Sequence, residues 1–290
     1  MVWLGSQRGH AADWSTQLWV RATGREVALD EHPWLAGPIG ETREIGGECF
    51  RRWAVRENLR VEDGSGTRGL LADFALLDGP RFRAASVAEG VRNFYERTTE
   101  YELDAWSNWC GAFQPFGWLL AVMFSRRLRQ LNVPLTGLDT SRGISNEVWH
   151  LVEPHAGELR LVAWVRHLLG TGTTVYAGSY GACSIPGWSG PCLKVVFPLP
   201  NGNAIVFLKP VLEEDGSLSL ISSGERFGDP GFYFTVKRAG GRLAVRYLRS
   251  FRETIRVYAS GTEEVRADHE MRFWGATVLR IHYRMRRRLR

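Results

Sequence analysis

Residues 193–208, LKVVFPLPNGNAIVFL, contain the pattern that decides the fold. Two apolar, largely β-branched runs, Leu193–Phe197 and Ala204–Leu208, flank the turn sequence Asn-Gly-Asn at 201–203. Glycine and asparagine tolerate the left-handed backbone conformation that a tight hairpin turn requires. The stretch therefore predicts an antiparallel β-hairpin, and the second half of the chain repeats this design.

Glycine-containing turns recur at intervals of roughly ten residues on both sides of this hairpin. They are expected at residues 154–157, 170–172, 187–190, 215–216, 228–231, 239–241 and 260–261. The last run, 279–286, alternates apolar with polar or charged side chains, as in a strand with one buried face. A long series of hairpin-linked strands accumulates twist, so we predict a strongly curved antiparallel meander sheet or barrel.

Two helices are predicted ahead of this sheet. Residues 87–99 place apolar side chains at i, i+3 and i+4, the spacing of one buried helical stripe. Residues 116–131 follow a proline and end before an Asn-Val-Pro sequence, which suits the start and the end of a helix. Residues 101–109 predict a short strand between them. The predicted fold class is therefore α+β and mostly β, with two helices covering the curved sheet.

The residues before this body predict a small β-rich region. Strands are expected at residues 14–22, 50–62 and 68–77. A seam is expected near residues 78–86, where a strand-like run ends in Asp-Gly-Pro and the first helix begins. The sequence thus predicts a β-rich N-terminal region over 1–84 and a main body over 85–290.

The sequence predicts a cytoplasmic location. Residues 1–10 lack the basic and apolar segments of a signal peptide. The most apolar stretch, Phe116–Phe124, is about half as long as the ~20 residues that cross a bilayer. Four scattered cysteines form no metal-binding spacing, and Cys183 and Cys192 flank a turn across which they are expected to face each other. We expect buried thiols, with a disulfide at this pair as the alternative.

Positive charge is concentrated at the C-terminus. The net charge is +6, and residues 284–290 read RMRRRLR. A solvated tail is one interpretation. The other is a contact with an anionic membrane surface or a nucleic acid. A peripheral protein that uses its arginine-rich C-terminus in this way is the alternative function.

Known catalytic motifs do not decide the function. The sequence has no Gly-x-Ser-x-Gly elbow and no phosphate loop, and its histidines lack zinc-binding spacing. No cofactor and no metal site is therefore predicted, and the chain is not assigned as an enzyme. A metal-dependent enzyme whose ligands come from distant strands stays an alternative.

Two residues are candidates for acid–base chemistry. Asp104 lies among Leu103, Trp106 and Trp109, where burial would raise the pKa of its carboxyl group. Its alternative is a solvated position. His269 follows Asp268, but adjacent residues on a strand point to opposite faces, so a polar strand position is the alternative.

The aromatic content is the most unusual feature of the composition. The chain has 12 Trp, and several aromatic residues cluster between 106 and 124. In a curved sheet they would fill the core or line a cavity. The predicted ligand-binding residues are Trp106, Trp109, Phe113, Trp118, Tyr233 and Tyr283. We therefore predict binding of a hydrophobic small molecule inside the curved sheet, with conversion of that molecule left open.

In architecture alone, the prediction for residues 86–290 resembles curved-sheet ligand binders such as the lipocalins and the helix-grip proteins. No shared motif accompanies this resemblance, and no residue is transferred from it. Helix-grip proteins end in a long helix, whereas this chain is expected to end in a strand.

Overall fold

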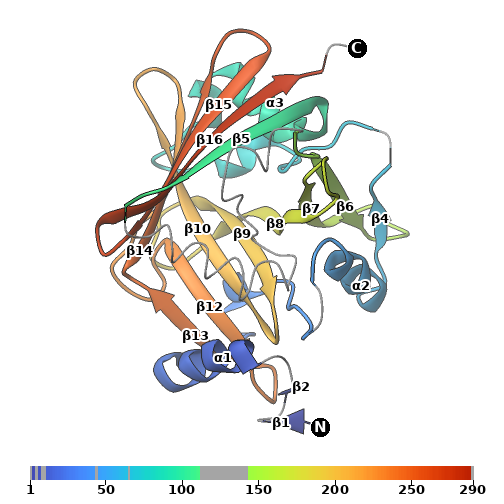
Figure 1. The fold of residues 1–290 in the computed structure, drawn as a ribbon, viewed down its shortest axis with the longest axis vertical. Coiled ribbons are helices and arrows are strands. Elements are labelled where there is room, and N and C mark those ends of the chain that lie inside the picture. The colour runs from blue at the N-terminus through green and yellow to red at the C-terminus, as the bar shows by residue number, and fades with distance from the viewer. Residues whose placement is uncertain are drawn as a thin grey trace.

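One large, strongly curved antiparallel sheet dominates the computed structural model, which describes residues 2–3, 6–7, 11–42, 45–64, 66–111 and 143–288 (Figure 1). The α-helices described are α1 (Ala11–Thr23), α2 (Glu48–Arg56) and α3 (Glu89–Glu96). The strands are β1 (Val2–Trp3), β2 (Ser6–Gln7), β3 (Arg25–Ala28), β4 (Arg60–Glu62), β5 (Tyr101–Trp109), β6 (Glu147–Val152), β7 (Leu159–His167), β8 (Thr174–Ser184), β9 (Pro191–Leu199), β10 (Gly202–Leu212), β11 (Leu218–Ser222), β12 (Gly231–Lys237), β13 (Arg242–Leu248), β14 (Phe251–Ala259), β15 (Glu264–Phe273) and β16 (Ala276–Arg287). The predicted fold class, mostly β with a curved meander, is confirmed.

The sheet divides at the long strand β10. Its first half pairs with β12 and its second half pairs with β11, while β9 runs along its other side. One arm continues through β12, β13 and β3, and the other through β11, β14, β15, β16 and β5. The sheet does not close into a barrel. It curls so far, however, that isolated bridges at Ile144 link Leu103 on β5 to Leu168 after β7.

The hairpin formed by β9 and β10 follows the predicted pattern. Asn201 adopts a φ of 58° in the turn. Gly202 follows it, and a Cβ atom at this residue would lie 1.9 Å from the carbonyl oxygen of Thr235 on β12. Glycine is therefore required at 202 because two backbones approach each other closely there.

The predicted helix over 87–99 and the strand over 101–109 are both present, as α3 and β5. In α3 the stripe Val91, Phe94 and Tyr95 is buried, and the helix packs against β14 and β15. The second predicted helix, 116–131, lies outside the described residues.

The strand predicted for residues 14–22 is wrong. These residues belong to helix α1, which carries Asp13 in its first turn and Arg21 in its last, as the helix dipole favours. Leu18 and Val20 would share one face of a strand, but in the helix Leu18 is 53% exposed and Val20 is fully buried. The run is too short for its apolar pattern to distinguish the period of 2 of a strand from the period of 3.6 of a helix.

Two further strands of the predicted N-terminal region need correction. Residues 50–62 form most of α2 followed by the short β4, because Phe50 and Ala54 are buried at the i, i+4 spacing of a helix. Residues 68–77 contain the 3₁₀ helix Phe74–Leu77, whose start is capped by Asp73 through a 2.7 Å bond from the Ala75 N–H. Local capping and helical packing therefore replace most of the two predicted strands.

The large sheet includes strands from both sides of the predicted seam at 78–86. Strand β3 pairs with β13, and β4 pairs with β6. Figure 1 shows α1 beside β12 and β13, and α2 beside β4 and β6. Residues 1–84 thus supply edge strands and covering helices to the sheet that residues 85–290 form.

Cys183 and Cys192 lie opposite each other in the register of β8 and β9, as the turn between them predicts. Both are free thiols. Burial raises the pKa of Cys183, and it raises the pKa of Cys192 to about 12, so both thiols stay protonated at neutral pH.

Candidate functional site

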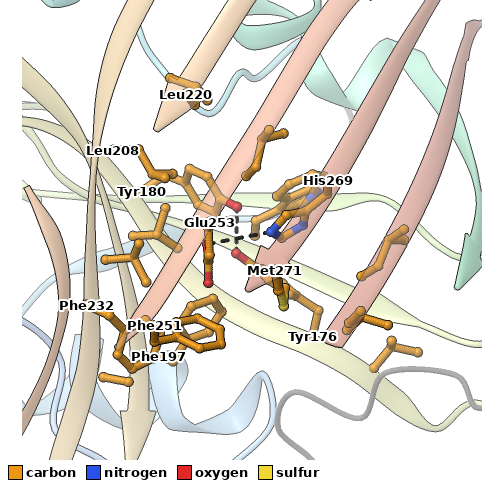
Figure 2. A pocket seen from close by; sticks show the side chains of 18 of the residues that line it. Tyr176, Tyr180, Phe197, Leu208, Leu220, Phe232, Phe251, Glu253, His269 and Met271 are labelled. Carbon is orange, nitrogen blue, oxygen red and sulfur yellow. Dashed lines mark hydrogen bonds and ion pairs between the residues drawn. The ribbon is translucent and has the colours of Figure 1, made fainter. Parts of the chain in front are cut away.

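A cavity of about 570 Å³ lies on the concave side of the sheet. Its walls come from β5, from β7 to β12, from β14 to β16, and from helices α1 and α3. Most of the side chains that line it are aliphatic or aromatic, including Phe197, Phe232 and Phe251, which Figure 2 shows gathered at one side. The curvature of the sheet therefore surrounds an apolar space large enough for a small molecule.

Strand alternation decides which residues reach this space. On β14, Phe251, Glu253, Ile255 and Val257 line the cavity, while the residues between them face outward. The inward residues of β15 and β16 follow the same rule and include His269 and Tyr283. A period of two thus brings a carboxylate, an imidazole and a phenol to one wall.

Glu253 and His269 form a pair inside the cavity. Ile255 of β14 lies directly opposite His269, so Glu253 is its diagonal neighbour on the same face. The Nε2 atom of His269 lies 3.6 Å from Oε2 of Glu253, and both side chains are about nine-tenths buried. Tyr283 on β16 stacks on the imidazole, with ring centroids 6.4 Å apart. Figure 2 shows the two groups facing each other across the strands.

The facing wall carries a buried arginine. On β7, Val162, Trp164 and Arg166 point inward, and Arg166 is only 6% exposed. Its guanidinium carbon lies 4.3 Å from the Trp164 ring centroid, 4.1 Å from that of Tyr176 and 5.6 Å from that of Tyr283. Such contacts attract a cation to the faces of aromatic rings.

Two tyrosines of β8 complete this wall. The hydroxyl groups of Tyr176 and Tyr180 are 2.6 Å apart, although the residues are four positions apart on a strand. Gly178 between them makes this possible, because a Cβ atom there would lie 3.0 Å from the Tyr176 hydroxyl and 3.2 Å from the Phe197 ring. Burial raises the pKa of both tyrosines and of Tyr283, so all three are neutral hydrogen-bonding groups at physiological pH.

A buried amide holds the cavity wall in place behind Trp164. The Trp164 indole N–H donates to Oδ1 of Asn146 over 2.5 Å. Nδ2 of Asn146 donates to the carbonyl oxygens of Thr98 and Tyr101, over 2.7 and 2.9 Å. Asn146 thereby ties the strand with Arg166 to the start of β5.

Three of the predicted site residues line this cavity. They are Trp109, His269 and Tyr283. His269 faces Glu253, whereas the neighbouring Asp268 points outward and accepts a 2.7 Å bond from His282. His269 and Asp268 thus point to opposite sides of the strand, as the sequence predicts for adjacent residues.

The other predicted residues lie elsewhere. Trp106 is 44% exposed on the outer face, beneath Arg284. Asp104 lies on that face too, where Arg284 donates to its carboxylate over 2.8 Å. Tyr233 is fully buried on the other side of β12, where its hydroxyl donates to the carbonyl oxygen of Asp229. Phe113 and Trp118 lie outside the described residues.

Sequence reasoning missed Arg166 and Glu253. Each occupies an inward position in a strand whose other inward residues are apolar. Arg166 lies between Trp164 and a bulge in β7, and Glu253 lies between Phe251 and Ile255 in β14. A charged residue at a predicted core position was the signal that could have identified both.

The C-terminal arginines form ion pairs with carboxylates of β5 and of the turn that precedes it. Arg284 pairs with Asp104, and Arg287 donates two hydrogen bonds to Glu100 over 2.8 and 3.0 Å. These residues belong to β16. The cluster thus neutralises carboxylates of β5 and its flank, which reduces the charge it offers to an anionic partner. Among the residues described, no group of three or more His, Cys, Asp or Glu side chains is arranged to hold a metal ion.

Comparison with known proteins gives one distant similarity. No protein-family model matches the chain, and no solved structure matches it. The chain is 26% identical over 243 residues to "Uncharacterized membrane protein YndJ" of Bacillus subtilis (strain 168), which covers 83% of this chain and 41% of the relative. The chain thus spans well under half the length of the relative that it matches.

This similarity contradicts the predicted cytoplasmic location, because the matched protein is named as a membrane protein. Across the described part of the chain, no helix combines the length and the apolar character needed to cross a bilayer.

Proposed function

We propose that this chain binds a hydrophobic small molecule in the cavity of its curved sheet. The observation that supports the proposal is the apolar space of about 570 Å³, within the usual range of ligand pockets. Most of its lining is apolar. Its polar residues include Arg166, Glu253 and His269 on β7, β14 and β15, and a second group on α1 that contains Asp13. An apolar body would thus contact the aliphatic and phenylalanine side chains, while a polar end would meet Arg166, Glu253, His269 or a tyrosine.

A series of straight-chain alcohols from hexanol to tetradecanol tests this proposal. Each methylene that enters the cavity contributes ~0.8 kcal/mol, so the affinity should rise about fourfold per carbon until the cavity is full and then level off. Isothermal titration calorimetry of the delipidated protein measures the series. An affinity that does not depend on chain length would refute binding in this cavity.

The variant Ala204→Phe supplies the matched comparison. Ala204 lines the cavity, so the added ring should shorten the chain length at which the affinity levels off. Val55→Phe adds similar bulk at a residue of α2 that is 82% exposed, and it should leave the series unchanged. The same shift in both variants would mean that the alcohols bind elsewhere.

A second candidate function is conversion of the bound molecule by general acid–base catalysis. The buried Glu253–His269 pair favours it, because a carboxylate beside an imidazole orients it to accept a proton from a ligand. The test is exchange of the α-hydrogens of 2-dodecanone with deuterium, followed by NMR in heavy water. Exchange above the buffer rate that is lost in His269→Gln supports the proposal, and exchange at the buffer rate refutes it.

A further inference from the structure

Arg166 carries a charge into the cavity that the described residues do not balance directly. The residue is only 6% exposed, and it lines the apolar cavity. Its guanidinium lies against the rings of Trp164, Tyr176 and Tyr283 and forms a hydrogen bond with the neutral Tyr283 hydroxyl. Its Nε atom has no hydrogen-bond partner among the described residues. Arginine is rarely buried unless it is paired, because removing its charge from water is costly.

The aromatic contacts offset only part of this cost. A cation–π contact contributes ~0.5–2 kcal/mol, which is less than the several kcal/mol needed to desolvate an ion. A ring face is also a poor substitute for an oxygen acceptor, and a single phenol oxygen, that of Tyr283, does not satisfy all of the guanidinium N–H groups. The position thus provides hydrogen-bond donors and a positive charge at the end of an apolar space.

We propose that Arg166 binds the anionic carboxylate head of a long-chain amphiphile such as a fatty acid, whose hydrocarbon chain occupies the rest of the cavity. This inference rests on the proposed function and assigns the ligand a head group. A carboxylate matches the planar guanidinium and satisfies two N–H donors at once.

The acidic residues that line the cavity, Asp13 and Glu253, favour a head with a single negative charge. Glu253 lines the same space and lies 3.6 Å from His269, so a dianionic head would meet an additional carboxylate there. The Arg166 guanidinium lies over the Tyr176 ring, and the neutral hydroxyls of Tyr176 and Tyr180 are 2.6 Å apart. One of these hydroxyls donates to the other, which leaves the second free to donate to the head group. The hydrocarbon chain would lie along Phe197, Phe232 and Phe251.

The test compares dodecanoate with dodecanol at pH 8, where the acid is ionised. In the unmodified protein dodecanoate should bind at least tenfold more tightly than dodecanol, as expected of hydrogen bonds to a charged group. Arg166→Met keeps an unbranched apolar stem, although a shorter one, and removes the charge. It should lose that preference and bind dodecanol within threefold of the unmodified protein.

Arg160→Met is the matched control. Arg160 lies on the same strand but is exposed and pairs with Glu153 on the surface, so its replacement should change neither affinity. Equal affinity of the unmodified protein for acid and alcohol would overturn the assignment of Arg166, even if Arg166→Met fails to fold. Binding of neither ligand would instead overturn the proposed function itself, and the two failures are therefore distinguishable.

Discussion

The same substitution, alanine to phenylalanine, at two buried positions should show whether the concave side of the sheet is empty or filled. Ala204 on β10 is 1% exposed and lines the cavity, opposite Phe197 on β9 and Phe234 on β12. Ala163 on β7 is fully buried on the convex side, in the cluster that packs beneath Phe50 of α2. The two residues have the same side chain, the same burial and the same secondary structure, and they differ in whether open space lies before them.

The expected effects follow from packing. At Ala163 the new ring has no space, and overpacking of this kind costs ~1–3 kcal/mol of the free energy of unfolding. At Ala204 the ring enters the cavity, where burying it recovers ~2 kcal/mol against a loss of ~1 kcal/mol in side-chain entropy. We therefore expect Ala204→Phe to remain within ~1 kcal/mol of the unmodified protein.

Urea unfolding followed by tryptophan fluorescence measures both free energies. We expect Ala163→Phe to have a clearly lower free energy of unfolding than Ala204→Phe. Equal losses in the two variants, or a loss above ~2 kcal/mol in Ala204→Phe, would show that the concave side is as tightly packed as the convex side.

Three further predictions concern the surrounding structure. Asn146→Ala should lower the free energy of unfolding by ~2–3 kcal/mol in urea titrations, because the indole N–H of Trp164 loses its buried acceptor; a change below ~0.5 kcal/mol would contradict the role of this amide. Burial acts to raise the pKa of Glu100, but hydrogen bonds from Thr67 and Arg287 outweigh it and lower the pKa below its usual 4.5. The ionised carboxylate therefore stabilises the fold above the unfolded-state pKa, and this stabilisation is lost as the pH falls through the folded-state pKa. The melting temperature of Glu100→Gln should thus lie below that of the unmodified protein, with a difference that is largest above pH 4.5 and vanishes in acid. A difference that grows in acid would contradict this sign. Of the four thiols, the partly exposed Cys110 should react first with a disulfide reagent at pH 8. The buried Cys192 should react slowly, because burial raises its pKa to about 12. The fast phase should therefore persist in Cys192→Ser and disappear in Cys110→Ser.

The curved sheet was predictable because its signals are local. Glycine-containing turns and alternating runs specify hairpins, and repeated hairpins specify a meander. The N-terminal errors are also local in origin. A run such as 14–22 has too few residues to separate a period of 2 from one of 3.6, and packing of Val20 against β12 and β13 decides for the helix.

The site was less predictable because distant strands assemble it. His269 and Tyr283 lie on neighbouring strands, and alternation alone places both on the inner face. Glu253 and Arg166 join them only through the register of β14 with β15 and through the curvature that carries β7 to the facing wall. Trp106 shows that aromatic content alone does not identify the residues of a cavity. It lies three positions before Trp109 in β5, and an odd separation places the two side chains on opposite faces of the strand.

Xenon binding in crystals of the ligand-free protein shows whether the curved sheet encloses an empty apolar space, since xenon enters dry apolar cavities without requiring a chemical match. We expect anomalous xenon density among Phe197, Phe232 and Phe251, inside the curved sheet. Crystals under xenon pressure that show protein side chains filling this volume, and no xenon within it, would rule out a ligand cavity there.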